Sequence, residues 1–241
     1  KAPHLFSYLQ QLLDEENQPG KYILTPSNNF LLQENISQSL AGRIAYQILL
    51  PFSFNEVSDT VSTNTDEMII KGFYPPVYDQ NPDPKKWYAN YINTYVERDV
   101  RQLKNINNMS LFVKFLKLCA GRAGQLLNMN SLAIETGVDN KTISSWLSVL
   151  ENSYIIYSLQ PYFKNYNKRV VKSPKLYFYD TGLLTSLLGI REPGQLQAHP
   201  LRGSIFENFI LNEIVKEKIN FDHNFDIYFW RDNTGHEIDV L

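Results

Sequence analysis

Three carboxylates in the last part of the sequence have the types and spacing to bind a divalent cation. Glu207 lies in an amphipathic stretch, and Glu237 and Asp239 alternate in the final apolar run, so in a strand they share one face. Convergent carboxylates hold Mg²⁺, which activates water for phosphodiester cleavage. The alternative is that Glu237 and Asp239 face solvent and Glu207 caps a helix or pairs locally. Because three acids without a lysine are common, the residues alone favour that alternative.

A second candidate site is a basic stretch between residues 158 and 179, which contains no acid and several interleaved aromatic residues. Such a cluster attracts a phosphate backbone and makes binding depend on salt. The alternative is a module that packs only against protein, since Lys141 is the one cation of the expected recognition helix. Both interpretations stay open. The candidate nucleic-acid-binding residues are Lys141, Lys164, Lys168, Arg169, Lys172 and Lys175.

Ser27 and Arg43 form a third candidate pair. Tyr22 to Thr25 is a short apolar run that suits a buried strand, and Ser27 follows it closely. Ligands bind at the carboxyl edge of an α/β sheet, where Ser27 would contact a γ-phosphate and Arg43 would supply positive charge. The alternative is a turn serine and a surface arginine.

Other kinds of chemistry are excluded within these 241 residues. The sequence has no G-x-x-x-x-G-K-[ST] loop, no G-x-G-x-x-G fingerprint and no G-x-S-x-G elbow. The four histidines are scattered, and the single cysteine, Cys119, cannot build a structural zinc site or an internal disulfide. We therefore predict no metal site of that kind and a reducing, cytoplasmic location.

The elements that must position these residues follow from apolar periodicity and turn signals. We expect helices over 5–14, 87–106, 111–119, 131–136, 141–150 and 204–218, and strands over 154–162, 175–179, 226–230 and 236–241. Residues 52–83 are predicted to be irregular and residues 190–201 to be a linker. Ala133, Gly137 and Ile143 have helix-turn-helix spacing, and the two β-rich runs that follow predict a winged helix-turn-helix.

Composition indicates a folded, non-membrane protein. Hydrophobic residues make up 43% of the chain, the formal net charge is −2, and no apolar run approaches the roughly 18 residues that span a bilayer. The start at Lys1 has no initiator Met or signal-peptide pattern, and the last run stops in mid-pattern. We therefore expect the chain to be part of a longer protein.

Several of these motifs together resemble a prokaryotic AAA-type P-loop ATPase family. The resemblance begins with the leucine-rich first helix, Tyr22-Ile-Leu-Thr-Pro-Ser-Asn-Asn-Phe30 and Ser39-Leu-Ala-Gly-Arg43. Tyr95-Val-Glu-Arg-Asp-Val100, Phe178-Tyr-Asp-Thr-Gly-Leu183 and Arg202-Gly-Ser-Ile-Phe-Glu-Asn208 resemble the family's C-terminal region of unassigned function. The resemblance covers nearly the whole chain.

The resemblance implies a role for each candidate residue. The phosphate loop and Walker B acids would lie upstream of Lys1, so ATP and Mg²⁺ are expected in the intact protein and none bound tightly to this chain. Ser27 takes the sensor-like position, and Arg43 is an arginine-finger or sensor candidate. Glu207 and Asp239 match the acidic positions of restriction-endonuclease-like folds, whose later Glu-x-Lys is absent up to Leu241.

The predicted fold class is an α/β remnant of a P-loop ATPase sheet, then an α+β winged helix and a partial α/β nuclease-like domain. The predicted boundaries are 1–60 for the ATPase part, 61–108 for a helical connector, 109–189 for the winged helix and 190–241 for the nuclease-like part. We predict ATP hydrolysis by the intact protein and DNA as the partner of the winged helix. The alternatives are a non-enzymatic DNA-binding or protein-interaction module, including self-association, and, more weakly, a Mg²⁺-dependent nuclease.

Overall fold

The computed structural model describes residues 5–16, 18, 20–25, 44–58, 64–95, 108–162, 173–232 and 234–241. The chain divides into two compact units, residues 1–48 and residues 49–241. Within the described ranges, no helix has both the length and the apolar character needed to cross a bilayer.

The first unit contains α1 (Leu5–Glu16), which begins as the leucine spacing predicts. Leu9 is buried on its inner face, and Gln11 Nε2 donates to Glu15 Oε1 at 2.9 Å one turn later. The expected buried strand over Tyr22 to Thr25 does not form, and Ile23 is 88% exposed. A buried strand needs hydrogen-bonded neighbours, and the described part of this unit supplies none.

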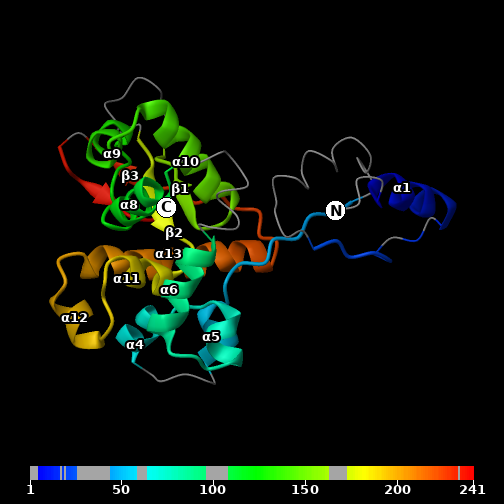
Figure 1. Cartoon of the computed structure of the whole chain (residues 1–241), viewed down its shortest axis with the longest axis horizontal. Coiled ribbons are helices and arrows are strands. Elements are labelled where there is room, and N and C mark those ends of the chain that lie inside the picture. The colour runs from blue at the N-terminus through cyan, green and yellow to red at the C-terminus, as the bar shows by residue number, and fades with distance from the viewer. Residues whose placement is uncertain are drawn as a thin grey trace. The chain divides into compact units, whose positions relative to one another are not determined.

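The second unit is mostly helical, with two small antiparallel sheets (Figure 1). Its first half comprises α3 (Phe54–Val57), α4 (Thr65–Lys71), α5 (Pro75–Asp79), α6 (Pro84–Tyr95), α8 (Met109–Ala120), α9 (Met129–Thr136) and α10 (Asn140–Asn152). Its second half comprises β1 (Ile156–Leu159), β2 (Lys175–Phe178), α11 (Thr181–Leu187), α12 (Pro193–Ala198), α13 (Arg202–Asn220), β3 (Trp230–Arg231) and β4 (Glu237–Ile238). The predicted α/β fold class and domain boundaries stay predictions.

Three segments contain helices that the sequence did not predict, and one of them is residues 181–187, which form α11. Residues 52–83 were expected to be irregular, yet they form α3, α4 and α5, and Asn64 caps α4 by accepting from Asp66 N at 3.0 Å. The expected linker over 190–201 contains α12, whose Leu196 is buried. Proline stands in the first turn of both α5 and α12, where its fixed φ starts a helix and does not break one.

The α9–α10 pair forms where the turn signals predict. Gly137 ends α9 at φ +89°, and the Asp139 side chain caps α10 by accepting from Thr142 N at 2.6 Å. Ile143 and Trp146 of α10 are buried against the core. The two strands β1 and β2 then pair antiparallel, with Ile156 opposite Phe178. The winged-helix assignment of these elements stays a prediction.

Helix α11 is the centre of the second unit. It contacts α4, α6, α8 and α13, and almost all of its residues are buried (Figure 1). Asp180, which is fully buried, caps it by accepting from Leu183 N at 2.7 Å and also accepts from Phe73 N at 2.6 Å. Gly182 lies so close to Tyr88 that an added Cβ would stand 2.3 Å from the phenol oxygen. The packing of α6 on α11 therefore requires glycine there.

The start of the second unit is fixed to α13. Lys216 is buried, and its Nζ donates to the carbonyl oxygen of Phe52 at 2.7 Å and to Glu213 Oε1 at 2.9 Å. Glu213 Oε2 accepts from Phe54 N at 2.6 Å. The Lys216 ammonium also lies 4.3 Å from the centre of the Phe73 ring.

Backbone hydrogen bonds join the two small sheets side by side. Tyr162 N donates to Phe229 O at 2.7 Å, and Phe229 N donates to Gln160 O at 3.2 Å. Leu241 N donates to Tyr228 O at 2.8 Å. The segment around Phe229 therefore lies between the end of β1 and the last residues of the chain. This arrangement brings residues 237–239 toward β2.

Candidate functional site

Lys175 of β2 lies at the centre of a cluster of acids that come from α13 and from the final hairpin. Its Nζ is 3.0 Å from Glu207 Oε1, 3.0 Å from Asp239 Oδ1, and also paired with Glu237 Oε1. The lysine side chain is 3% exposed, whereas Asp239 is 57% exposed. The ammonium is therefore enclosed, and the acids extend from it to the surface. We call Lys175, Glu207, Glu237 and Asp239 the Lys175 cluster.

The inner side of the cluster is built by β2 and α13. All four residues of β2 are buried, so neither face of the strand exposes the Lys175 side chain to solvent. Glu207 lies on the second turn of α13, and its Oε1 also accepts a hydrogen bond from the Tyr177 hydroxyl. The next residue, Asn208, fixes the helix to β2 by accepting from Phe178 N at 2.9 Å and donating to Phe178 O at 2.7 Å.

The outer side of the cluster comes from the final hairpin. Arg231 pairs with Glu237 across β3 and β4, and Arg231 NH1 is 3.4 Å from Glu237 Oε2. Glu237 thus lies between two cations. Asp232 Oδ1 accepts from Thr234 N and His236 N, at 2.9 and 3.0 Å, which closes the turn. Glu237 and Asp239 reach the same ammonium, the outcome that alternation along a strand predicts.

The charge states follow from burial and pairing. Burial lowers the pKa of Lys175, but hydrogen bonds to Glu237, Glu207 and Asp239 outweigh it and raise the pKa above the usual value. Burial, and then the bond to Glu207, raise the pKa of the Tyr177 hydroxyl. The lysine therefore stays charged and the tyrosine neutral near pH 7. Neither group is a general base in this state.

The cluster places a protein ammonium where three carboxylates converge. In the part of the chain that the structure describes, no three His, Cys, Asp or Glu side chains are grouped so that they could hold a metal ion. A divalent cation at these acids would therefore have to compete with Lys175. The cluster joins β2, α13 and β4 by charge, and the nuclease hypothesis for Glu207 and Asp239 stays a prediction.

The other predicted site residues are separated from this cluster or lie outside the described residues. Ser27 and Arg43 lie outside the described residues, as do Lys164, Lys168, Arg169 and Lys172. Lys141 is exposed at the start of α10. Lys175 was grouped with these cations, but its ammonium is enclosed by acids and does not reach the surface.

Sequence reasoning missed three parts of the site: Lys175 as partner of the acids, Tyr177 and Arg231. One signal was available for Arg231, because a hairpin around residues 232–235 places it opposite Glu237. Lys175 gave no such signal, since it lies 32 residues from Glu207 and 64 from Asp239.

Comparison with known proteins gives three family matches along the chain. Residues 62–194 match a domain of unknown function, DUF8612. The chain belongs to the DUF8612 family. In this DUF8612 protein, residues 1–58 match an AAA domain, and residues 202–241 match a second domain of unknown function, DUF4143. The AAA and DUF4143 matches support the AAA-type, ATPase-like family that the sequence resembles.

The DUF8612 chain also has full-length similarity to uncharacterized bacterial proteins. It is 31% identical over 242 residues to uncharacterized proteins of Mycobacterium tuberculosis and Mycobacterium bovis, covering 100% of this chain and 53% of theirs. An uncharacterized protein of Haemophilus influenzae is 22% identical to it over 215 residues. This match covers 83% of the present chain and 52% of the Haemophilus influenzae protein. The chain thus spans about half the length of the curated relatives it matches. No solved structure matches it.

Proposed function

We propose that the intact protein is an AAA-type ATPase that binds and hydrolyses ATP with Mg²⁺. The observation that carries this proposal is the AAA-domain match of residues 1–58, directly before the DUF8612 and DUF4143 matches. Within that match, Ser27 is the residue for sensing the γ-phosphate and Arg43 the residue for stabilising the transferring phosphoryl group.

Phosphate release by the natural full-length protein tests this proposal. With Mg²⁺ and ATP the protein should turn over, and Arg43→Ala should lower kcat by roughly a hundredfold or more if Arg43 stabilises the transition-state charge. Arg202→Ala is the matched control, because Arg202 is an exposed arginine whose nearest acid, Asp66, is 3.6 Å away. Turnover indistinguishable from background, or equal kcat in the two variants, would contradict the proposal. The 241-residue chain, which has no phosphate loop, should give no heat when titrated with ATP and Mg²⁺.

We further propose that the α8–α9–α10–β1–β2 region is a winged helix that contacts DNA through backbone phosphates. Support comes from the element order, from the glycine turn at Gly137 and from the exposed Lys141 at the start of α10. Further support comes from the four cations in residues 163–172. The exposed positions of α10 offer few base-reading groups, so binding should be insensitive to sequence.

Fluorescence anisotropy with a labelled duplex at two salt concentrations tests the DNA contact. Affinity should fall steeply with salt, and changing Lys164, Lys168, Arg169 and Lys172 to glutamine should reduce the slope of log K against log salt by about 3–4. Lys86→Gln on α6, also an exposed lysine, should leave the slope unchanged. A slope that the fourfold variant does not alter would remove the DNA proposal.

A protein contact is the second candidate function for the same region. Ile134 on α9 is 82% exposed, and Met129 at the start of the same helix is 43% exposed. Large exposed apolar side chains of this kind are typical of interaction sites when they are neighbours. We propose self-association through α9. Sedimentation should show an oligomer that Ile134→Ser disrupts, while a monomer at all concentrations would contradict it.

A further inference from the structure

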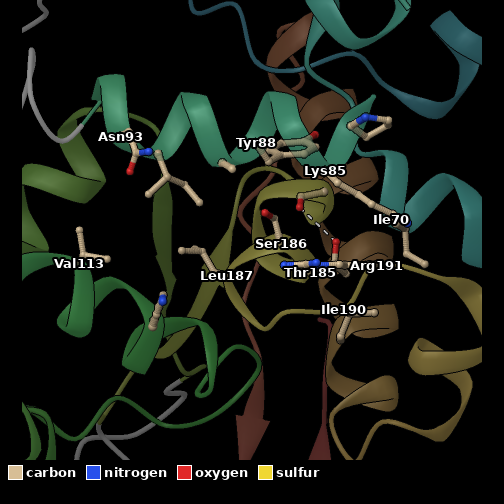
Figure 2. A pocket seen from close by; sticks show the side chains of 15 residues that line it. Ile70, Lys85, Tyr88, Asn93, Val113, Thr185, Ser186, Leu187, Ile190 and Arg191 are labelled. Carbon is tan, nitrogen blue, oxygen red and sulfur yellow. Dashed lines mark hydrogen bonds between the residues drawn. The ribbon is translucent and has the colours of Figure 1, made fainter. Parts of the chain in front are cut away.

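A cavity of about 250 Å³ lies between α6, α8 and α11, away from the Lys175 cluster. Figure 2 shows Lys85 and Tyr88 of α6 along one side, and Thr185, Ser186 and Leu187 of α11 across from them. Val113 of α8 closes one end, and Ile190 and Arg191 follow α11 at the other. Its apolar surface comes from Ile70, Ala89, Ile92, Val113, Leu187 and Ile190.

Among the residues that the structure describes, the charged groups around this cavity are all positive. Lys85, Lys117 and Arg191 line it, and no described carboxylate does. Lys85 has a partner outside the cavity, because its Nζ is 3.4 Å from Glu192 Oε1. In the described ranges, neither Lys117 nor Arg191 forms an ion pair with an acid. The positive charges of Lys117 and Arg191 are therefore available to pair with an anionic ligand.

The polar groups divide into those already bonded and those available. The Thr185 hydroxyl donates to the backbone oxygens of Thr181 and Gly182, and the Tyr88 hydroxyl donates to Lys71 O. These two hydroxyls are therefore occupied. Within the described part of the chain, no hydrogen bond engages the side chains of Asn93 and Ser186, which also line the cavity. Both can donate to an oxygen-rich anion.

We propose that this cavity binds a small organic phosphate monoester that carries one ring or a short apolar chain. Two unpaired cations match the charge of a phosphate dianion, and arginine recognises phosphate with two parallel N–H donors. The apolar walls would contact the organic part. The volume lies just below the range of pockets for drug-sized ligands, so a single ring fits better than a dinucleotide.

The test uses the 241-residue chain with phenyl phosphate as the probe, and phenol and inorganic phosphate as its two halves. Phenyl phosphate should bind at least tenfold more tightly than either half, and it should shift the methyl NMR signals of Ile92, Val113 and Ile190. The double variant Lys117→Gln and Arg191→Gln should weaken binding at least tenfold, because charge-assisted hydrogen bonds are lost. Lys86→Gln, an exposed lysine of α6 outside the cavity, should bind as the natural chain does.

Two outcomes would overturn the proposal. One is phenyl phosphate binding that the double variant leaves unchanged. The other is chemical-shift changes confined to methyl groups away from the cavity. Lys117 and Arg191 are exposed, so an unchanged urea midpoint would show that the double variant is folded. If the double variant instead lost only duplex binding, the cations would belong to a nucleic-acid surface, which would also contradict a small-molecule site.

Discussion

The buried carboxylate of Asp180 joins Phe73 to the start of α11. Its Oδ2 accepts from Phe73 N at 2.6 Å and its Oδ1 accepts from Leu183 N at 2.7 Å. The two donors are more than a hundred residues apart in the sequence, because Phe73 precedes Asp180 by 107 positions. One side chain thus connects the central helix to the turn between α4 and α5.

Asp180→Ala should lower the free energy of unfolding by about 3–5 kcal/mol, because two buried N–H groups lose their acceptor. Urea unfolding measures the loss. Asp139→Ala is the matched control, since Asp139 also caps a helix but is exposed, and the loss in that variant should be clearly smaller. Equal losses in the two variants would show that burial adds nothing to the Asp180 bonds.

Lys175→Met should lower the free energy of unfolding by about 2–4 kcal/mol. Breaking a buried ion pair from one side costs about 3–5 kcal/mol, and water reaches the acids here and reduces the cost. Lys141→Met, a change to an exposed lysine, should alter stability by less than about 0.5 kcal/mol. If Lys175→Met were as stable as the natural chain, the cluster would not hold β2, α13 and β4 together.

Stability should fall between pH 5 and pH 2 in a way that depends on Asp139. Hydrogen bonds from Thr142 hold the pKa of its carboxyl below the usual value, so the native state favours the ionised form. Its contribution is present above the unfolded-state pKa of about 3.9 and is lost as pH falls through the lower folded pKa. The urea midpoint of Asp139→Asn, which keeps a capping oxygen, should fall less over this range. A parallel fall in both proteins would contradict the assignment.

Asp232 should titrate below its ordinary range for a similar reason. Bonds from His236 and Thr234 hold the pKa of the Asp232 carboxyl low. Carboxyl carbon NMR should follow its titration directly. His236→Ala should move the pKa of Asp232 back toward about 3.9. A pKa that His236→Ala leaves in place would show that the turn backbone alone sets it.

Gly137→Ala should destabilise the protein by about 1–2 kcal/mol. Gly137 has φ +89°, which costs an L-residue energy, and an added Cβ would meet nothing within 4 Å, so the backbone alone is responsible. An added Cβ at Gly203, in the first turn of α13, would also meet nothing within 4 Å, and its helical φ suits any L-residue. Gly203→Ala should be neutral or stabilising by up to about 1 kcal/mol. Thermal unfolding of both variants separates conformational cost from packing.

Cys119 should be unreactive in the native state. It is fully buried, and burial raises the pKa of its thiol well above the usual value, so almost no thiolate is present near pH 8. A disulfide reagent should modify it only in urea, in step with unfolding. Fast labelling of the native chain would mean that α8 opens locally.

The features that sequence predicts correctly are those with local causes. The α9–α10 turn depends on Gly137 and Asp139, and the final hairpin depends on Asp232 to Gly235, so neighbouring residues determine both. Helix α13 is long enough for its apolar spacing to be read. In contrast, α5 and α12 are short helices that begin at proline, in segments that the sequence predicts to be irregular or a linker.

The Lys175 cluster shows why the site was predicted only in part. The acids Glu207 and Asp239 stood out by type, and alternation linked Glu237 to Asp239. Lys175 lies in a strand whose four residues are all buried, so no alternation marks its environment. It also belongs to the basic stretch, which suggested a surface position. Only the packing of α13 on β2 shows that its partner is an acid cluster.

Helix α13 contacts both the start of the second unit and the Lys175 cluster. Lys216 donates a hydrogen bond to Phe52 O, and Glu213 accepts one from Phe54 N. Both bonds lie only a few residues after the boundary between the two units. Glu207 lies nine residues earlier on the same helix, roughly 13 Å along its axis. The two ends of one helix therefore tie the start of the second unit to the packing of β2 and β4.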